Sequence, residues 1–199
     1  HTHGAMALLR GAVEDVSLED WYNEHIWVYE SRLQPRDVYV GTLLAACEML
    51  LSGVTAVADQ YYFMDEAARA YRDAGMRADL AWLVYGIGEG WEEEYRRALQ
   101  FAEDYRSFDP RITVSLGPHS PYLCPLEFLE EVGDRAALAR LKVHIHVSEE
   151  YEQVERARRE WGMTPVQALD RAGILGEGTI LAHAYHATDD DLAWAEALV

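Results

Sequence analysis

Short, strongly apolar runs alternate along the chain with longer segments in which apolar residues recur at helical spacing. Because the apolar runs lack a polar face, they are typical of parallel strands that are covered on both sides. The intervening segments predict helices that open at proline or close at glycine, as in PLEFLEEVGDRAALARL and MDEAARAYRDAGM. The predicted strands are VTAVADQ, ADLAWLVYG, RITVSLGPH, KVHIHVSE and GTILAHAYH.

Strands and helices that alternate with short connections predict βα units with parallel strands and right-handed crossovers. The GxGxxG fingerprint of a dinucleotide-binding sheet does not follow any of these strands. We therefore predict an α/β fold and favour a (β/α) barrel over a dinucleotide-binding sheet. Residues 1–199 form a single barrel segment in this interpretation.

Histidines mark the ends of several predicted strands. His119, His146 with nearby Glu149, and His183 each lie at or just after the carboxyl end of a strand. In a barrel these ends converge on one face, where active sites are built. This placement predicts that the four residues contribute to one site. The other histidine of KVHIHVSEE, His144, could be either a ligand or a core residue.

The chain begins with the sequence HTH. In an extended segment His1 and His3 point to the same side and could bind one metal ion. A different interpretation is accidental chelation, because a free terminal amine with histidine in the third position can wrap Cu(II) or Ni(II) in square-planar geometry.

Composition narrows the classes of partner. The formal net charge of −18 would repel nucleic acid and anionic membranes, so we expect a small neutral or cationic ligand instead. The most apolar stretch, VYVGTLLAACEMLLSGV, is short for a membrane span and contains Glu48, so it predicts a buried helix. Cys47 and Cys124 are widely spaced, which favours a reducing, cytoplasmic location.

The ordered motifs HTH, GAMALLRG, YESRL, GPHSPYLCP, HVSEE and LAHAYH resemble the amidohydrolase superfamily over essentially the whole chain. The branch they most resemble contains metal-dependent deaminases and chlorohydrolases, including those acting on S-adenosylhomocysteine and methylthioadenosine. The resemblance implies hydrolytic deamination of a nucleoside, purine, pyrimidine or related N-heterocycle. Amide or chloro-hydrolysis at the same metal centre is the alternative within enzymes.

The resemblance also implies roles for individual residues. One zinc or iron ion would be held by His1, His3 and His146. Glu149 would carry a proton between the attacking water and a ring nitrogen, and His183 would orient and deprotonate that water. Glu30 in YESRL and His119 in GPHSPY would bind the sugar hydroxyls of the substrate.

The resemblance implies that residues 1–199 are one catalytic segment of a partial (β/α)8 TIM barrel, because some parts of the family pattern are missing. The first strand, the last two strands, the β-sandwich and the aspartate ligand after the eighth strand are expected to lie outside residues 1–199. Asp189–Asp191 instead predict the capped start of a helix. A chain truncated at both ends could be an inactive fragment, or could associate as a homo-oligomer through an exposed sheet edge.

Substrate specificity is also expected to depart from the branch. Trp82 and Trp91 fall where the enzymes acting on S-adenosylhomocysteine carry arginines for the substrate carboxylate. An indole cannot pair with a carboxylate as a guanidinium does. We therefore expect a less charged substrate, bound against aromatic walls.

Overall fold

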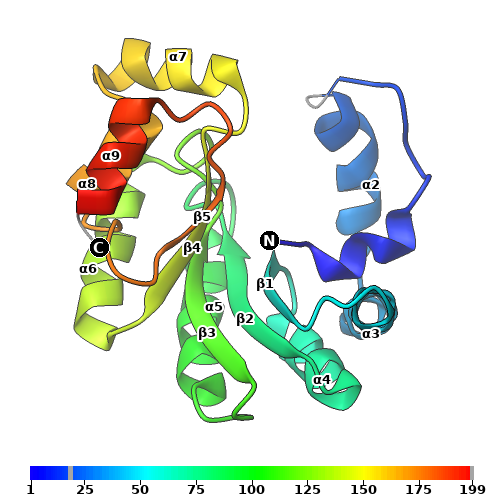
Figure 1. The fold of residues 1–199 in the computed structure, drawn as a ribbon. Helices are drawn as coiled ribbons and strands as arrows, with labels where there is room; N and C mark the ends of the chain where they lie inside the picture. Colours follow the sequence, from blue (N-terminus) through cyan, green and yellow to red (C-terminus); the bar gives the residue numbers. More distant parts are fainter. Residues whose placement is uncertain (18–19, 198–199) are drawn as a thin grey trace. The chain divides into compact units, whose positions relative to one another are not determined.

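Strands and helices alternate in the computed structural model, which describes residues 1–17 and 20–197 (Figure 1). The strands are β1 (Ala56–Tyr61), β2 (Arg77–Val84), β3 (Ile112–Pro118), β4 (Lys142–Val147) and β5 (Ile180–His183). The longer helices are α3 (Pro35–Leu51), α4 (Met64–Ala74), α5 (Trp91–Tyr105), α6 (Leu126–Ala139), α7 (Tyr151–Trp161), α8 (Pro165–Arg171) and α9 (Asp189–Ala197). Short helical segments are η1 (Gly4–Leu9), η2 (Trp21–Ile26) and α2 (Trp27–Glu30).

The strands follow one another in the sheet in chain order, β1-β2-β3-β4-β5. The β3–β4 and β4–β5 pairs are parallel, with His146 opposite Ala182 and Val147 opposite His183. Each of the five apolar runs therefore forms a strand, and at least one helix lies between successive strands. This is the α/β, partial TIM-barrel fold that the sequence predicts.

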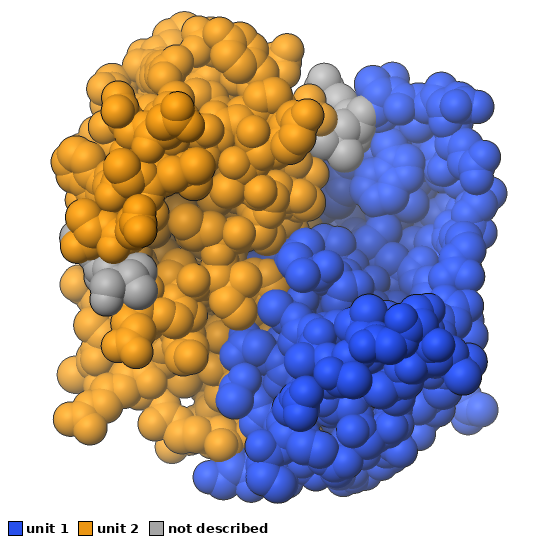
Figure 2. Space-filling view, viewed as in Figure 1, with its two compact units in different colours: residues 1–80, 107–113 blue, residues 81–106, 114–199 orange. Residues whose placement is uncertain are grey.

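The chain divides into two compact units, which Figure 2 colours separately. Unit 1 comprises residues 1–80 and 107–113, and unit 2 comprises residues 81–106 and 114–199. Strands β2 and β3 pass from one unit into the other, whereas β1 belongs to unit 1, and β4 and β5 belong to unit 2.

In unit 1, α3 packs against η1 and α4. Gly41 lets the backbone of Ala5 approach α3 so closely that any β-carbon at this position would overlap it. The sequence predicts that α3 is buried, and this is only half correct. One face, including Val38 and Ala46, is buried, whereas Leu44 on another face is exposed. None of the helices in the described ranges combines the length and apolarity that a membrane crossing requires.

In unit 2, the capped start predicted for the last helix is confirmed. Thr188 and Asp191 exchange hydrogen bonds at the start of α9, and Thr188 donates its hydroxyl proton to Asp191 as well. Asp189 and Asp190 are exposed, but Asp191 is buried and also accepts a hydrogen bond from the Thr164 hydroxyl. Asp191 therefore joins the start of α9 to the start of α8, a role that the acidic run did not reveal.

Position 86, in the loop after β2, requires glycine because of its backbone conformation and because of the nearby side chain of Phe128. Its φ is +69°, and a β-carbon would overlap the ring of Phe128. We expect Gly86→Ala to lower the free energy of unfolding by roughly 2–4 kcal/mol. Gly88→Ala is the matched control because φ is +86° there with open space around it. Urea denaturation should show the larger loss for Gly86→Ala, and equal losses would exclude the Phe128 overlap as the cause.

Candidate functional site

The amino-terminal histidines are held against the end of β1 in unit 1. The Thr2 amide donates to the Ala58 carbonyl at 2.9 Å, and the Gln60 amide donates to the Thr2 carbonyl at 3.2 Å. This single parallel bridge takes the place of the extended segment that the sequence predicts. The rings of His1 and His3 lie edge to face with centroids 4.8 Å apart, so both imidazoles occupy the same region of the unit.

The side chain of His3 is oriented by a backbone carbonyl. Its Nδ1 lies 2.5 Å from the carbonyl oxygen of Gln60. Because a carbonyl can only accept, Nδ1 carries the proton and Nε2 keeps its lone pair. A metal-ligating histidine commonly has this second hydrogen bond, which fixes the tautomer and the direction of the donor nitrogen.

Asp59 lies directly behind the HTH segment and is fully buried. Both carboxylate oxygens are 3.2 Å from the Gly4 amide nitrogen, and the Tyr71 hydroxyl donates to Oδ2 at 2.7 Å. A β-carbon on Gly4 would come within 2.8 Å of this carboxylate. Asp59 therefore holds Gly4, the residue that follows the two histidines. Glycine is needed at this position because a larger residue would keep the carboxylate away.

Burial raises the pKa of Asp59 to about 6, although the hydrogen bonds from Tyr71 and Gly4 oppose the shift. The unfolded chain ionises near 3.8, so the folded state binds this proton more tightly. Stability should therefore fall as pH rises from about 4 to 6, by on the order of 3 kcal/mol from this group. Asp59→Asn has no such proton to lose.

We therefore expect the metal-free Asp59→Asn protein to gain stability relative to the parent protein as pH rises from 4 to 7. Chemical denaturation of both proteins across this range measures the difference. Asp37→Asn serves as a control at a half-buried carboxylate. A difference between the parent and Asp59→Asn that does not change with pH would show that Asp59 ionises normally in the folded protein.

Glu30 lies at the end of α2, also in unit 1. Burial raises its pKa, while the hydrogen bond that the Tyr61 hydroxyl donates to Oε1, 2.7 Å long, lowers it. The Tyr61 ring in turn lies 5.9 Å from that of His3. The half-buried carboxylate of Glu30 is thus tied to the end of β1, where the histidine pair is also held. It can accept hydrogen bonds from hydroxyl groups, as its predicted role requires.

In unit 2, the histidines at the ends of β3, β4 and β5 lie in one row. The ring of His146 stacks on that of His119 at 4.6 Å and on that of His183 at 5.4 Å. The ring of Tyr85 also stacks on that of His119, with the ring centroids 5.0 Å apart. The prediction that these strand ends bring His119, His146 and His183 together is therefore confirmed within unit 2.

His146 is oriented in the same way as His3. Its Nδ1 lies 2.8 Å from the His119 carbonyl oxygen, which also accepts the His146 backbone amide at 3.0 Å. The proton is therefore on Nδ1, and Nε2 keeps its lone pair. His144, on the same strand, is completely buried.

Glu149 follows β4 and faces His183. Its Oε1 is 3.7 Å from His183 Nε2, and its Oε2 accepts a hydrogen bond of 3.1 Å from the Tyr122 hydroxyl. Two partly exposed side chains capable of proton transfer therefore lie beside a histidine whose Nε2 has a lone pair. This arrangement can take a proton from a water molecule and deliver it to a nearby base.

The backbone turns sharply at both of these strand ends. Ser148 after β4 has φ +48°, and His183 and Ala184 at the end of β5 have φ +70° and +51°. Residues with side chains rarely adopt this left-handed conformation, and when they do they cluster at functional sites. The Ala184 amide holds the second turn through a 2.9 Å hydrogen bond to the Val147 carbonyl.

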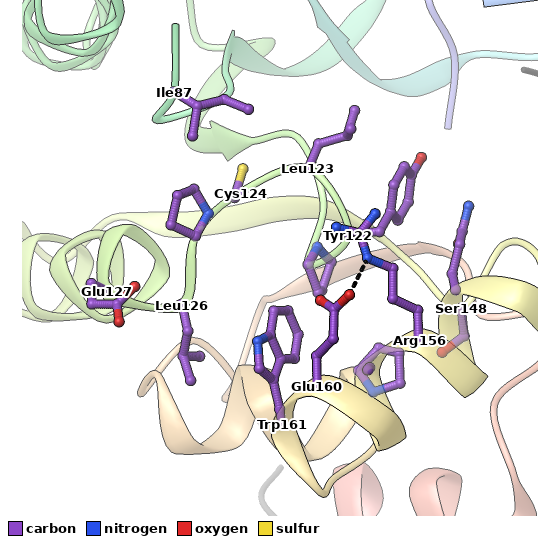
Figure 3. Close-up of a pocket in the computed structure, with 15 residues that line it drawn as sticks. Ile87, Tyr122, Leu123, Cys124, Leu126, Glu127, Ser148, Arg156, Glu160 and Trp161 are labelled. Atoms are coloured by element: carbon purple, nitrogen blue, oxygen red, sulfur yellow. Dashed lines mark hydrogen bonds and ion pairs between the residues drawn. The ribbon is translucent and has the colours of Figure 1, made fainter.

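Unit 2 also contains a pocket of about 460 Å³ (Figure 3). Tyr122, Cys124, Ser148 and Trp161 are among its lining residues, and the Arg156–Glu160 ion pair lies at its wall. Burial raises the pKa of the Cys124 thiol to about 12, so this cysteine is not a nucleophile at neutral pH.

The expected aromatic wall is not formed by Trp82. Its indole packs on Phe101 of α5 at 5.7 Å and lies 3.3 Å from Glu94, where the Nε1 proton is donated to the carboxylate. Trp91 packs edge to face on Phe128. Both indoles therefore pack against helical residues of unit 2. The aromatic ring stacked on the histidine row is instead Tyr85, which the sequence analysis did not single out.

Each unit contains a histidine oriented as zinc ligands commonly are. His3 in unit 1 and His146 in unit 2 each have Nδ1 hydrogen-bonded to a backbone carbonyl, which leaves Nε2 as the nitrogen through which histidine would bind zinc. Three supporting residues were missed by sequence reasoning: Asp59, which holds Gly4, Gln60, which orients His3, and Tyr122, which holds Glu149. Asp59 and Tyr122 could have been suspected, because Asp59 lies near the end of a predicted strand and Tyr122 lies within the quoted motif GPHSPY.

Known deaminases are similar in sequence to almost the whole of this chain. The chain is 42% identical over 193 residues to the 5-methylthioadenosine/S-adenosylhomocysteine deaminase of Dictyoglomus thermophilum, covering 96% of this chain and 45% of that protein. It is 42% identical over 186 residues to the 5'-deoxyadenosine deaminase of Methanothermobacter thermautotrophicus, covering 92% of this chain and 44% of that protein. It thus spans about half the length of these relatives.

Among solved structures, the zinc-bound adenosine deaminase of Xanthomonas campestris superposes with a TM-score of 0.90 at 31% identity, covering 98% of this chain and 46% of that one. The match to the Amidohydrolase family itself runs over residues 1–198. Over residues 1–198, the chain therefore belongs to the amidohydrolase family.

Proposed function

We propose that the protein containing this chain is a metal-dependent hydrolytic deaminase of nucleosides or related N-heterocycles. The observation that carries the proposal is Glu149, held by Tyr122 and facing His183 at the end of adjacent strands. The proposal is also supported by two relatives, each 42% identical in sequence, that are named as deaminases of adenine nucleosides.

His1, His3 and His146 are the proposed ligands of one divalent metal ion, with zinc preferred over iron because zinc is bound in the Xanthomonas adenosine deaminase. The fixed tautomers of His3 and His146 support this assignment. Bound zinc would make the attacking water more acidic.

The chain's own residues would then move the protons. Glu149 takes one proton from the water, with His183 holding the water and favouring its deprotonation. The water oxygen bonds to the ring carbon that carries the amino group, while Glu149 delivers the proton to the adjacent ring nitrogen. The second proton of the water then passes from the new hydroxyl group to the amino group as the carbon–nitrogen bond breaks, so that ammonia leaves and a ring carbonyl remains.

Glu30 and His119 are the proposed contacts to the sugar hydroxyls. Glu30 is an acceptor fixed by Tyr61, and His119 is held between Tyr85 and His146 with its Nδ1 2.8 Å from the Ser120 hydroxyl. The absence of arginine at positions 82 and 91 supports a neutral substituent on the sugar in place of an amino-acid tail. Methylthioadenosine and 5'-deoxyadenosine are therefore preferred over S-adenosylhomocysteine in this proposal.

Ammonia release from the zinc-loaded protein tests the function. The panel contains 5'-deoxyadenosine, methylthioadenosine, S-adenosylhomocysteine, adenosine and guanine, together with a chlorotriazine for the hydrolytic alternative. We expect ammonia from the nucleosides, with kcat/KM for methylthioadenosine at least tenfold above that for S-adenosylhomocysteine. Chloride release without ammonia would favour the alternative, and a zinc-loaded protein with no turnover would contradict the enzyme assignment.

Location and assembly are further parts of the proposal. Cys47 and Cys124 are both free thiols, which supports a reducing, cytoplasmic location. Trp27 and Tyr29 on α2 expose about half of their surface, at 50% and 45%, which favours self-association. Sedimentation velocity at several concentrations would reveal a homo-oligomer.

A further inference from the structure

We propose that Tyr122 is a positioning residue that fixes the Glu149 carboxylate in the orientation for proton transfer. The inference rests on the proposed role of Glu149. Tyr122 lies in the loop after β3 and Glu149 in the loop after β4, and the hydroxyl of Tyr122 joins the two loops through its 3.1 Å hydrogen bond to Glu149 Oε2.

The Glu149 carboxylate needs such a contact because the hydrogen bonds within the loop after β4 fix only the backbone of Glu149. The Glu149 amide donates to the Gln153 side chain at 3.1 Å, which fixes the main chain before α7. Beyond the backbone the side chain has three rotatable bonds and remains partly exposed, at 24%. Of its two oxygens, Oε2 is bound to Tyr122 and Oε1 faces His183.

This contact gives the two oxygens different tasks. Because the phenol hydroxyl donates its proton to Oε2, a proton that Glu149 takes from water must reside on Oε1. Oε1 is the oxygen on the His183 side, at 3.7 Å from Nε2. Tyr122 thus leaves Oε1 as the oxygen that exchanges protons. It also keeps Oε1 on the side of His183, the residue proposed to hold the water.

Tyr122 is itself placed by packing. Its ring meets that of His119 edge to face at 5.6 Å, and Tyr122 is also one of the residues that line the 460 Å³ pocket (Figure 3). Removing the hydroxyl alone leaves these ring contacts intact. Tyr122→Phe therefore separates the orientation of Glu149 from the packing of the loop.

The test compares Tyr122→Phe with the parent protein, both loaded with zinc. We expect kcat for methylthioadenosine to fall about tenfold, the size expected when one hydrogen bond to a charged group is lost. KM should stay within twofold, and zinc content and melting temperature should be unchanged. A crystal structure of Tyr122→Phe should show the Glu149 carboxylate rotated or in several conformers.

Tyr39→Phe is the matched control. It removes a tyrosine hydroxyl that donates to a carboxylate at 3.0 Å, that of Asp73, on the surface of unit 1. It should leave kcat and the Glu149 conformation unchanged. An unchanged kcat and an unmoved Glu149 in Tyr122→Phe would overturn the inference, as would parallel losses of zinc and melting temperature. If the parent protein deaminates nothing, the proposed function fails, and the crystal structure still decides whether Tyr122 orients Glu149.

Discussion

Glu149→Gln should reduce ammonia release by about 10²–10⁴-fold, the contribution typical of a positioned general acid and base. The amide has the same shape and can still accept the hydrogen bond from Tyr122, so the loop after β4 keeps its structure. It cannot take a proton from water at neutral pH. We expect kcat to fall while KM changes little, because the lost interaction belongs to the transition state.

Glu152→Gln provides the control, because it removes an exposed carboxylate from the first turn of α7 close to the same loop. It should keep its activity. Zinc content is the second measurement, and it should be equal in the parent protein and both variants. If Glu149→Gln loses zinc, Glu149 is a ligand, and its role as proton carrier is wrong.

The strand ends were predictable because their signal is local. A buried parallel strand must be apolar throughout, so a histidine or glutamate where the run stops is conspicuous. Glu149 follows KVHIHVS in this way, and His183 closes GTILAH. The parallel sheet then requires these ends to lie at one edge, which is why the row of His119, His146 and His183 could be predicted without coordinates.

The supporting residues were less predictable because their partners are distant in sequence. Asp59 contacts Gly4 and Tyr71, and its place near the end of VTAVADQ marks it as a candidate without showing which groups it contacts or that it is buried. Tyr122 reaches Glu149 across 27 residues. Such pairs depend on how neighbouring strands pair and on side-chain direction, neither of which periodicity encodes.

The wrong expectation for Trp82 also arises because periodicity does not give side-chain direction. Trp82 lies in β2, where alternate residues point to opposite faces of the sheet. A one-residue uncertainty in register therefore decides between a ring that faces the site and one that packs against α5. The structure puts the indole against Phe101, so the position that lacks arginine does not supply an aromatic surface in its place.

His146→Ala should remove both the metal and the activity. The substitution takes away a neutral nitrogen ligand whose direction is fixed by the His119 carbonyl, so the remaining protein ligands would hold zinc far more weakly. We expect bound zinc to fall from about one ion per chain to a small fraction after dialysis, with turnover at background. Metal analysis and a competition titration with a zinc chelator measure this directly.

Two variants make the result specific. His186→Ala removes a neighbouring histidine whose structural contact to Ser148 uses the backbone amide, which alanine keeps. It should retain zinc. His3→Ala should lose zinc together with His146→Ala if both bind the same ion, whereas retention of Cu(II) by His146→Ala but not by His3→Ala identifies the terminal chelate. Zinc that survives in His146→Ala would place the metal elsewhere and remove the basis for assigning the water-activating role to this strand end.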